Sequence, residues 1–157
     1  MLENSKHIII VGAGIAGLTA ALSLRHHGIR ASIYERSPEI ITAGAGIQLS
    51  PNANRVLSRI GVLKEISSVS IRCHGVKVFD YKSNRQLALF DYMKFKGNDF
   101  FYFCHRADLV GVLYAACQKL EIPVYFNKKL EKIINKKAVF SDGEALSAEL
   151  IIGADGL

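Results

Sequence analysis

A glycine-rich turn between an apolar run and a helical pattern constrains this chain more than any other feature. The apolar run is His7–Val11, and it is followed by glycines with the spacing G-x-G-x-x-G, at Gly12, Gly14 and Gly17. Leucine and alanine then recur at helical spacing, and Arg30–Tyr34 returns as a second predicted strand. The order of strand, glycine turn, helix and strand predicts a βαβ unit.

Each part of this unit has a physical task if it binds a dinucleotide. Gly12 permits a tight turn, Gly14 leaves room for a pyrophosphate beside the backbone, and Gly17 lets the helix lie close to the sheet. The N–H groups at the start of the helix and the positive end of its dipole would face the phosphates. Glu35 follows the second strand and can accept hydrogen bonds from a ribose diol. The alternative is a glycine turn in an ordinary βαβ unit that binds nothing.

The composition adds limits rather than a function. The chain has 157 residues, about the length of one domain, and half of them are hydrophobic. Its formal net charge is +6, but the lysines are scattered and are densest around a predicted hairpin at residues 128–141, which is typical of a solvated face. We therefore expect no nucleic-acid partner. A mildly basic face would also suit an anionic cofactor or substrate.

Membrane, secretion and metal sites are not indicated either. No apolar run approaches the roughly 18 residues of a membrane helix, and the N-terminus lacks the pattern of a secretory signal. We therefore expect a cytoplasmic protein without a membrane partner. Cys73, Cys104 and Cys117 are widely spaced and form no C-x-x-C pair, so we expect reduced, buried thiols and no metal site. Cys104 and His105 are adjacent in a predicted strand and would point to opposite faces, which argues against a nucleophile pair.

The remaining pattern alternates between helices and strands. After a short strand at residues 47–49, Ser50 is placed as the N-cap of a helix that has Pro51 at its first position. The further predicted elements are strands in residues 69–81, 85–90 and 100–103, a loop at 91–99, a helix at residues 107–120, a short strand at 124–126, a hairpin at 128–141 that turns at Asn135 and Lys136, a second tight turn at Asp142 and Gly143, and a strand at 148–152. We therefore expect an α/β fold with a parallel sheet, helices and a small antiparallel sheet that crosses over it.

Four stretches together resemble one protein family. They read VGAGIAGLTAALSLRHHGI with YER, GAGIQLSPNANRVLSRIGV, HRADLVGVL and AELIIGADGL, and they cover almost the whole chain in order. The chain is similar to the N-terminal part of the class A flavoprotein aromatic hydroxylases, the para-hydroxybenzoate hydroxylase-like FAD-dependent monooxygenases, and most of all to their salicylate hydroxylase and 3-hydroxybenzoate 6-hydroxylase branch. The resemblance implies a truncated, Rossmann-like FAD/NAD(P)-binding fold, with FAD as cofactor and NADH or NADPH as co-substrate.

The resemblance also implies cofactor contacts outside the glycine turn. Glu35 would hold the adenosine ribose of FAD. Arg36 either lies near the adenine or the phosphates, or is a surface arginine. Residues 44–48 are small and polar, so their backbone would lie beside the flavin ring or the ribityl chain. The alternative for this stretch is a tight loop that merely needs its glycines.

Two later positions complete the implied site. Arg106 stands at the start of a helix, where the dipole disfavours a cation unless an anion is bound nearby, and the resemblance assigns it to FAD. Its alternative is an ion pair with Asp108 or Asp155. Asp155 and Gly156 match the family's D-G motif, or form a simple turn after a strand. No catalytic residue is predicted, and the predicted cofactor-binding residues are Gly12, Gly14, Ile15, Ala16, Gly17, Glu35, Arg36, Gly46, Ile47, Gln48, Arg106, Asp155 and Gly156.

Together these features predict the FAD-binding portion of a monooxygenase that uses NAD(P)H and O₂ to hydroxylate a small aromatic substrate. We expect an incomplete FAD-binding domain over residues 1–157, with a partial substrate-domain segment around residues 69–104. We expect the isolated chain to be inactive, because half of the enclosure that excludes water would be missing. Two alternatives stay open: an FAD-dependent oxidoreductase of another reaction type (halogenase, epoxidase or reductase), and a non-catalytic apo domain that forms a homo-oligomer through exposed apolar surface.

Overall fold

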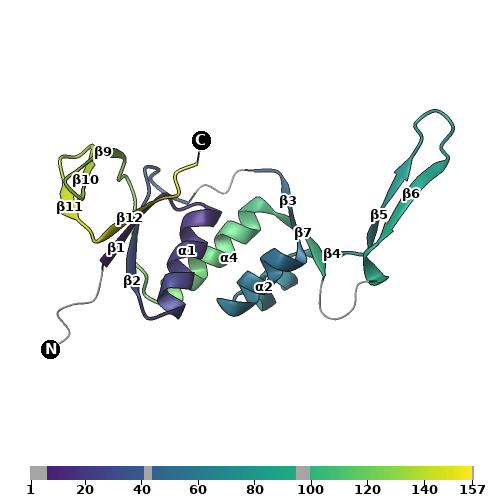
Figure 1. Cartoon of the computed structure of the whole chain (residues 1–157), viewed down its shortest axis with the longest axis horizontal. Helices are drawn as coiled ribbons and strands as arrows, with labels where there is room; N and C mark the ends of the chain where they lie inside the picture. Colours follow the sequence, from purple (N-terminus) through teal and green to yellow (C-terminus); the bar gives the residue numbers. More distant parts are fainter. Residues whose placement is uncertain (1–6, 41–43, 95–99, 157) are drawn as a thin grey trace. The chain divides into compact units, whose positions relative to one another are not determined.

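The computed structural model describes residues 7–40, 44–94 and 100–156 of the chain. The chain divides into two compact units, one made of Met1–Gly44 with Arg106–Leu157, and the other of Ala45–His105. Figure 1 shows the helices and strands of both. Each unit has its own sheet and its own helices.

The first unit is built on a parallel four-stranded sheet. Its strands are β1 (His7–Val11), β2 (Arg30–Tyr34), β8 (Val124–Tyr125) and β12 (Leu150–Gly153), in the order β12-β1-β2-β8, and every neighbouring pair is parallel. β1 and β2 are buried along their whole length after the first residue. Strands that are buried on successive residues in this way are typical of a parallel sheet with both faces covered. The predicted strands at 7–11 and 30–34 are confirmed at both ends.

Two helices cover one face of this sheet. α1 (Ile15–His26) and α4 (Arg106–Lys119) pack against each other, and Figure 1 shows both on the same side of the strands. Leu18 and Leu22 of α1 and Leu113 of α4 are almost completely buried. These large apolar side chains form the core between the helices and the sheet. The helix predicted at residues 107–120 is confirmed, displaced by one residue.

A small antiparallel sheet covers the other face. Its strands are β9 (Leu130–Ile134), β10 (Lys137–Phe140) and β11 (Ala145–Ser147), in the order β11-β10-β9. Phe140 packs into a cluster with the side chains of β1 and β2, and its ring stacks on that of Tyr34 with 4.9 Å between centroids. The predicted antiparallel sheet that crosses over a parallel one is therefore confirmed.

The turns of this small sheet show what local sequence could and could not predict. Asn135 and Lys136 both adopt left-handed backbone angles, with φ of 48° and 61°, as a two-residue hairpin turn requires. The hairpin turn predicted at these two residues is confirmed. The turn at Asp142 and Gly143 was also predicted, but the short strand β11 that follows it was not, because three residues carry too little alternation to mark a strand.

The second unit is built on a separate antiparallel sheet. Its strands are β3 (Gly46–Leu49), β7 (Phe101–His105) and β4 (Ile71–Cys73), with β7 in the middle. Two consecutive helices, α2 (Pro51–Arg59) and α3 (Leu63–Ser68), contact each other. The strands predicted at residues 47–49 and 100–103 correspond to β3 and β7.

The start of α2 corrects one detail of the sequence prediction. Ser50 is the N-cap and Pro51 is the first helical residue, as predicted, but the Ser50 side chain makes no capping bond to the helix. Its hydroxyl instead donates to Asn52 Oδ1 at 2.7 Å, since neighbouring polar side chains compete for a serine hydroxyl. Asn54 of the same helix donates to the Phe100 carbonyl oxygen at 2.6 Å and so ties α2 to the start of β7.

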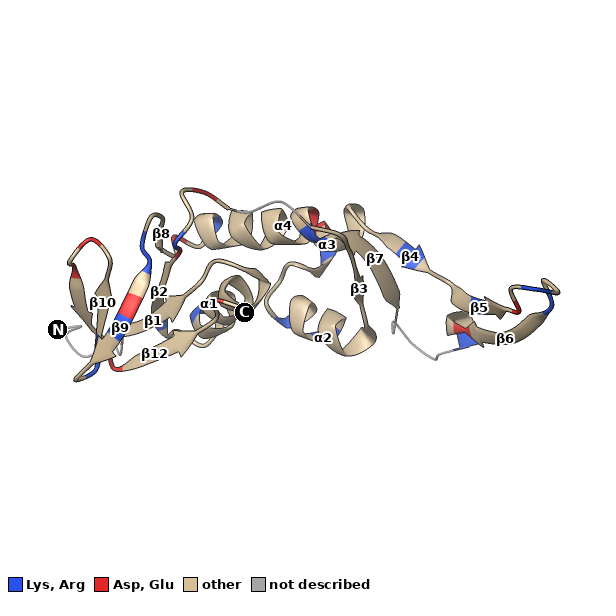
Figure 2. Ribbon diagram, turned by 90° about the horizontal axis from the view of Figure 1, so that it is seen from above, with Lys and Arg blue, Asp and Glu red and all other residues tan. Residues whose placement is uncertain are grey.

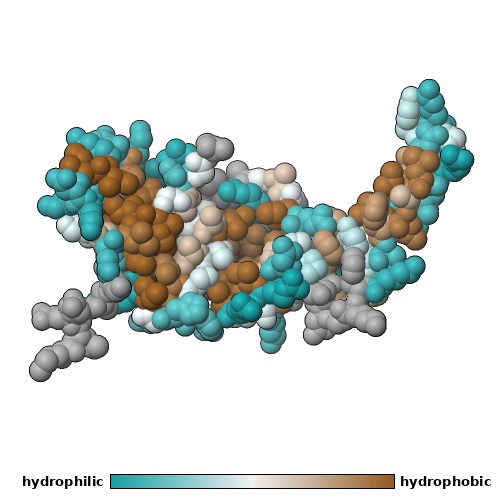
Figure 3. All heavy atoms as spheres, in the orientation of Figure 1, coloured by the Kyte–Doolittle hydropathy of each residue, from teal (hydrophilic) through white to brown (hydrophobic). Residues whose placement is uncertain are grey.

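A two-stranded hairpin completes the second unit. β5 (Gly75–Phe79) and β6 (Gln86–Asp91) pair in antiparallel fashion, and a short 3-10 turn, η1 (Tyr92–Lys94), follows. The loop predicted at residues 91–99 is described only up to residue 94, so Gly97 and Asn98 lie outside the described residues. Figure 3 shows apolar colour over the base of the hairpin and hydrophilic colour at its tip. The exposed large apolar side chains on its strands are Val76, Val78, Phe79, Leu87, Leu89 and Phe90.

The described part of the chain shows neither a continuous basic stripe nor a helix that could span a membrane. Figure 2 shows lysine and arginine distributed over helices, strands and turns, without one continuous basic stripe. No helix among the described residues has both the length and the apolar character needed to cross a membrane.

We expect Gly17→Ala to destabilise the first unit, because the added methyl group would stand 1.9 Å from the Gly12 carbonyl oxygen. Overpacking of this kind costs about 1–3 kcal/mol of unfolding free energy, which urea unfolding followed by circular dichroism measures. The control is Gly111→Ala in α4, where an added Cβ meets nothing within 4 Å. It should be neutral or stabilise by up to about 1 kcal/mol, since alanine is the better helix former. Equal destabilisation by the two substitutions would contradict the tight contact.

Candidate functional site

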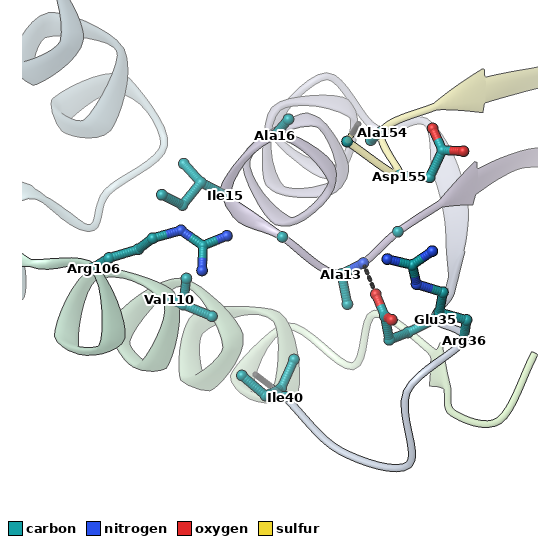
Figure 4. Close-up of a pocket in the computed structure, with 13 residues that line it drawn as sticks. Ala13, Ile15, Ala16, Glu35, Arg36, Ile40, Arg106, Val110, Ala154 and Asp155 are labelled. Carbon is teal, nitrogen blue, oxygen red and sulfur yellow. Dashed lines mark hydrogen bonds between the residues drawn. The ribbon is translucent and has the colours of Figure 1, made fainter. Parts of the chain in front are cut away.

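A cavity of about 380 Å³ lies at the carboxyl ends of three neighbouring strands of the parallel sheet. Its lining comes from residues 12–16 after β1, from Glu35 and Arg36 after β2, and from residues 154–156 after β12. Arg106 from α4 lines another side, as Figure 4 shows. Ligands of open α/β sheets bind outside the carboxyl ends of the strands, and a cavity of this size is typical of small-molecule sites.

Two backbone hydrogen bonds hold these strand ends together. The Gly12 N–H donates to the Tyr34 carbonyl oxygen at 2.8 Å, and the Ala154 N–H donates to the Val11 carbonyl oxygen at 2.8 Å. The sheet ladder is thus continued one residue past each strand. The glycine turn, the Glu35 segment and the Asp155 segment therefore meet at one edge.

The three glycines of the turn are required for different reasons. Gly12 has φ +105°, and a Cβ added there would stand 2.4 Å from the Ala154 carbonyl oxygen. A Cβ at Gly17 would stand 1.9 Å from the Gly12 carbonyl oxygen, so this glycine lets α1 approach the end of β1, as predicted. A Cβ at Gly14 would meet nothing within 4 Å, although Gly14 lines the cavity. No protein atom thus fills the space that a side chain would occupy at this position, and the predicted pyrophosphate contact there stays a prediction.

The first turn of α1 is suited to an anion. Gly14 is the N-cap and offers no side chain to the helix, and no acidic residue stands in the first turn. Helix N-termini leave their first N–H groups without partners inside the helix and carry the positive end of the dipole. Ile15 and Ala16 of this turn line the cavity, so their backbone can face a phosphate.

Glu35 is already held in place by backbone donors. Its Oε2 accepts from the Ala13 N–H at 2.7 Å, and its Oε1 accepts from the Ser37 N–H at 2.9 Å. Partial burial raises the pKa of the Glu35 carboxyl, but these hydrogen bonds and the nearby Arg36 charge outweigh burial and hold the pKa below its ordinary value. Glu35 is therefore a carboxylate at neutral pH, fixed at the rim of the cavity and able to accept further hydrogen bonds.

Charged side chains of both signs surround the cavity. Arg36, Arg106 and Asp155 line it together with Glu35. A Cβ added at Gly44, which has φ +152°, would stand 2.9 Å from Arg106 Cδ, so the backbone of this glycine lies directly against the arginine. Figure 4 shows the Arg106 side chain extending from α4 toward the glycine turn. The structure thus brings the predicted residues of this unit around one cavity, and their contacts with FAD stay a prediction.

The predicted residues Gly46, Ile47 and Gln48 lie elsewhere in the chain. They belong to β3 of the second unit, where they pair with β7. Their predicted place beside the flavin ring stays a prediction.

Sequence reasoning missed a second, smaller cavity of about 110 Å³ beside the first. It is lined in part by Lys128 and Lys129, which the sequence placed on a solvated face. Lys128 Nζ donates to Asp142 and, at 2.6 Å, to Glu144, and these hydrogen bonds raise the pKa of its ammonium group. The lysines reach this edge only because β8 pairs with β2, a long-range pairing that no local pattern reveals.

Three further residues that line the larger cavity were not predicted: Ile40, Val110 and Ala154. Val110 follows Arg106 by one helical turn, so helical spacing from the predicted arginine would have found it. Ala154 adjoins the predicted Asp155 and donates to β1, as described above. Ile40 carries no signal in the sequence.

The cysteines are not part of the site. Cys73, Cys104 and Cys117 are free and buried, as predicted. Cys104 is buried whereas His105 is exposed, which confirms that the two side chains do not form a pair. Burial raises the pKa of the Cys117 thiol to about 12, so it is unreactive at neutral pH. Among the residues that the structure describes, no cluster of three histidine, cysteine or acidic side chains could hold a metal ion.

Comparison with known proteins identifies one family. The model of a family described as an FAD binding domain matches residues 5–157. The chain is 33% identical to the 3-amino-4-hydroxybenzoate 2-monooxygenase of Streptomyces cremeus, over 100% of the chain and 41% of that protein. It is also 33% identical to the 3-hydroxybenzoate 6-hydroxylase 1 of Aquipseudomonas alcaligenes, over 97% of the chain and 41% of that protein.

A solved structure agrees with these relatives. The tetrameric form of 2-methyl-3-hydroxypyridine-5-carboxylic acid oxygenase matches with a TM-score of 0.87 and 27% identity. The match covers 98% of this chain and 40% of that one. The chain thus spans about two fifths of the length of the proteins that it resembles.

We expect the Glu35 carboxylate to stabilise the folded chain in a pH-dependent way. Because its folded-state pKa lies below the ordinary 4.5, its contribution is present above pH 4.5 and is lost as the pH falls further, through the folded-state pKa. The free energy of unfolding of wild type should therefore exceed that of Glu35→Gln near neutral pH, and the difference should shrink below pH 4.5. Urea unfolding over this pH range measures it. Glu39→Gln, at an exposed position in the same segment, is the control, and a pH-independent difference at Glu35 would contradict the expectation.

Proposed function

This chain belongs to the family of FAD binding domains, and from that premise we propose that it is the FAD-binding portion of a flavin-dependent monooxygenase that hydroxylates a small aromatic compound with NAD(P)H and O₂. The observation that carries the proposal is the open space at Gly14, which lines one cavity together with the first residues of α1 and the fixed Glu35 carboxylate. The names of the relatives support the reaction class, since they are monooxygenases and hydroxylases of aromatic rings.

The residues of the first unit would hold the adenosine and pyrophosphate end of FAD. Glu35 would accept the ribose hydroxyls, and the N–H groups at the start of α1 would bind the pyrophosphate. Arg36 and Arg106 would offset its negative charge, with Asp155 and Gly156 at the opposite rim. FAD, when bound, supplies the electron transfer and the oxygen chemistry, and the role of this chain is to bind it, orient it and exclude water around it.

The second unit would contribute to the flavin and substrate side. We assign Gly46, Ile47 and Gln48 to contacts with the flavin ring or ribityl chain, as the family resemblance implies, and residues 69–104 to a part of the substrate domain. The whole protein's substrate would be a small aromatic compound, with NADH or NADPH as the co-substrate. These assignments rest on relatives of which the chain spans about 41%.

We also place the protein in the cytoplasm and expect it to self-associate. The three free, buried cysteines suit a reducing compartment. The exposed apolar side chains of β5 and β6 are typical of an interaction surface. One structural neighbour is described as tetrameric, which supports a homo-oligomer.

The test of FAD binding is Gly14→Val. Its backbone has φ −78° and ψ −174°, which valine adopts readily, and an added Cβ meets no protein atom within 4 Å, so the variant should fold with an unchanged melting temperature. We expect FAD to bind roughly tenfold more weakly or worse, because the side chain occupies the space meant for the pyrophosphate. Titration by flavin fluorescence measures this, and Gly111→Val, also in open space, is the control. Binding of FAD by Gly14→Val as tight as by wild type would overturn the proposal.

We expect the 157-residue chain alone not to hydroxylate an aromatic acid, because the relatives use chains of which it covers only about 41%. The assay supplies FAD, NADH or NADPH, and 3-hydroxybenzoate, and follows both the oxidation of the nicotinamide and the hydroxylated product. Free FAD at the same concentration gives the background rate. Product formation coupled to nicotinamide oxidation would show that the chain suffices by itself.

A further inference from the structure

The Glu35 carboxylate reaches back to the glycine turn. Its Oε2 accepts from the Ala13 N–H at 2.7 Å, across 22 positions of sequence, and its Oε1 accepts from the Ser37 N–H at 2.9 Å. Figure 4 shows the first of these bonds at the rim of the cavity. One side chain thus joins the turn after β1 to the segment after β2.

We propose that Glu35 is a latch that sets the conformation of the glycine turn before a dinucleotide arrives, so that it is a positioning residue acting through Ala13 as well as a ribose acceptor. The part of this inference that concerns FAD rests on the function proposed above. The latch itself concerns only the chain. The adjacent Gly12 N–H is bonded to the Tyr34 carbonyl oxygen at 2.8 Å, so two consecutive N–H groups of the turn are tied to the end of β2.

The latch is rigid because the backbone of Glu35 is itself fixed. Its N–H donates to the Tyr125 carbonyl oxygen at 2.8 Å, and its carbonyl oxygen accepts from the Lys128 N–H at 2.8 Å. The bond from Ala13 has an ionised acceptor, and such bonds are shorter and stronger than those between neutral groups. A fixed backbone and a charged acceptor together restrict the turn to one conformation.

The N–H groups of this segment fall into two sets, one bonded to the end of β2 and one at the start of α1. Those of Gly12 and Ala13 hold the turn to β2 and are not offered to a ligand. Ile15 and Ala16 line the cavity at the start of α1, where the first N–H groups of a helix have no acceptor inside the helix. The donors offered to a phosphate therefore come from the helix terminus, and they are already in position when the phosphate arrives.

The same carboxylate can hold the turn and accept a ribose without competition. A carboxylate has about four acceptor sites on its two oxygens; the two backbone bonds use one on each, and the Ser37 side chain uses a third. A ribose hydroxyl could donate to the site that remains. Binding would therefore add to the latch rather than open it.

The test measures amide hydrogen exchange by NMR in the apo chain, comparing wild type with Glu35→Gln and Glu35→Ala. The Ala13 amide should exchange slowly in wild type, faster in Glu35→Gln, and fastest in Glu35→Ala, with a total increase of roughly 10- to 100-fold, because a bond to a charged acceptor is lost. The Gly12 amide, whose acceptor is a backbone oxygen, should change much less. Glu39→Ala, which alters an exposed acid in the same segment, should leave both amides unchanged.

Two results would overturn the latch. One is an Ala13 amide that exchanges at the wild-type rate in Glu35→Ala. The other is an equal acceleration at Gly12 and Ala13, because Glu35 would then stabilise the whole edge of the sheet rather than the turn. No FAD is present in this experiment, so its failure leaves FAD binding untouched, and a chain that binds no FAD leaves the exchange result valid.

Discussion

The candidate site depends on one backbone contact, the approach of α1 to the carbonyl oxygen of Gly12. A Cβ at Gly17 would stand 1.9 Å from that oxygen, so any other residue would force the helix away from the strand. The helix terminus could then no longer direct its N–H groups and its dipole at the edge where three strands end. The anion site that we propose at this edge therefore depends on a packing constraint between a helix and a strand.

The two layers that cover the parallel sheet converge on Glu35 from opposite sides. The helix side reaches it through Ala13, which stands between β1 and α1 and donates to its carboxylate. The antiparallel sheet reaches it through Lys128, whose N–H donates to the Glu35 carbonyl oxygen and whose ammonium binds Asp142 and Glu144. A surface sheet that contributes no atom to the larger cavity thus helps to fix the acid at its rim.

What the sequence could predict was set by how local each interaction is. The strands at 7–11 and 30–34, the glycine turn and the hairpin turn at Asn135 follow from spacing within a few residues, and all were predicted. The bond from Ala13 to Glu35 was not, because it joins residues 22 positions apart and depends on the direction of one side chain. The place of Lys128 beside Glu35 was missed for the same reason, since it follows the pairing of β8 with β2. Ser50 shows that a prediction from local sequence can also fail, because its hydroxyl donates to the side-chain oxygen of Asn52 instead of capping the helix.

The three glycines of the motif are therefore needed for two different reasons, which the G-x-G-x-x-G pattern alone does not distinguish. Gly12 and Gly17 are glycines because protein atoms stand where a Cβ would be, and any βαβ unit with this tight a turn would need them whether or not it bound a ligand. Gly14 has no such neighbour, so nothing in the folding of the chain forbids a side chain there. We infer that the need for glycine at this position comes from a ligand, so that Gly12 and Gly17 report on packing whereas Gly14 reports on binding.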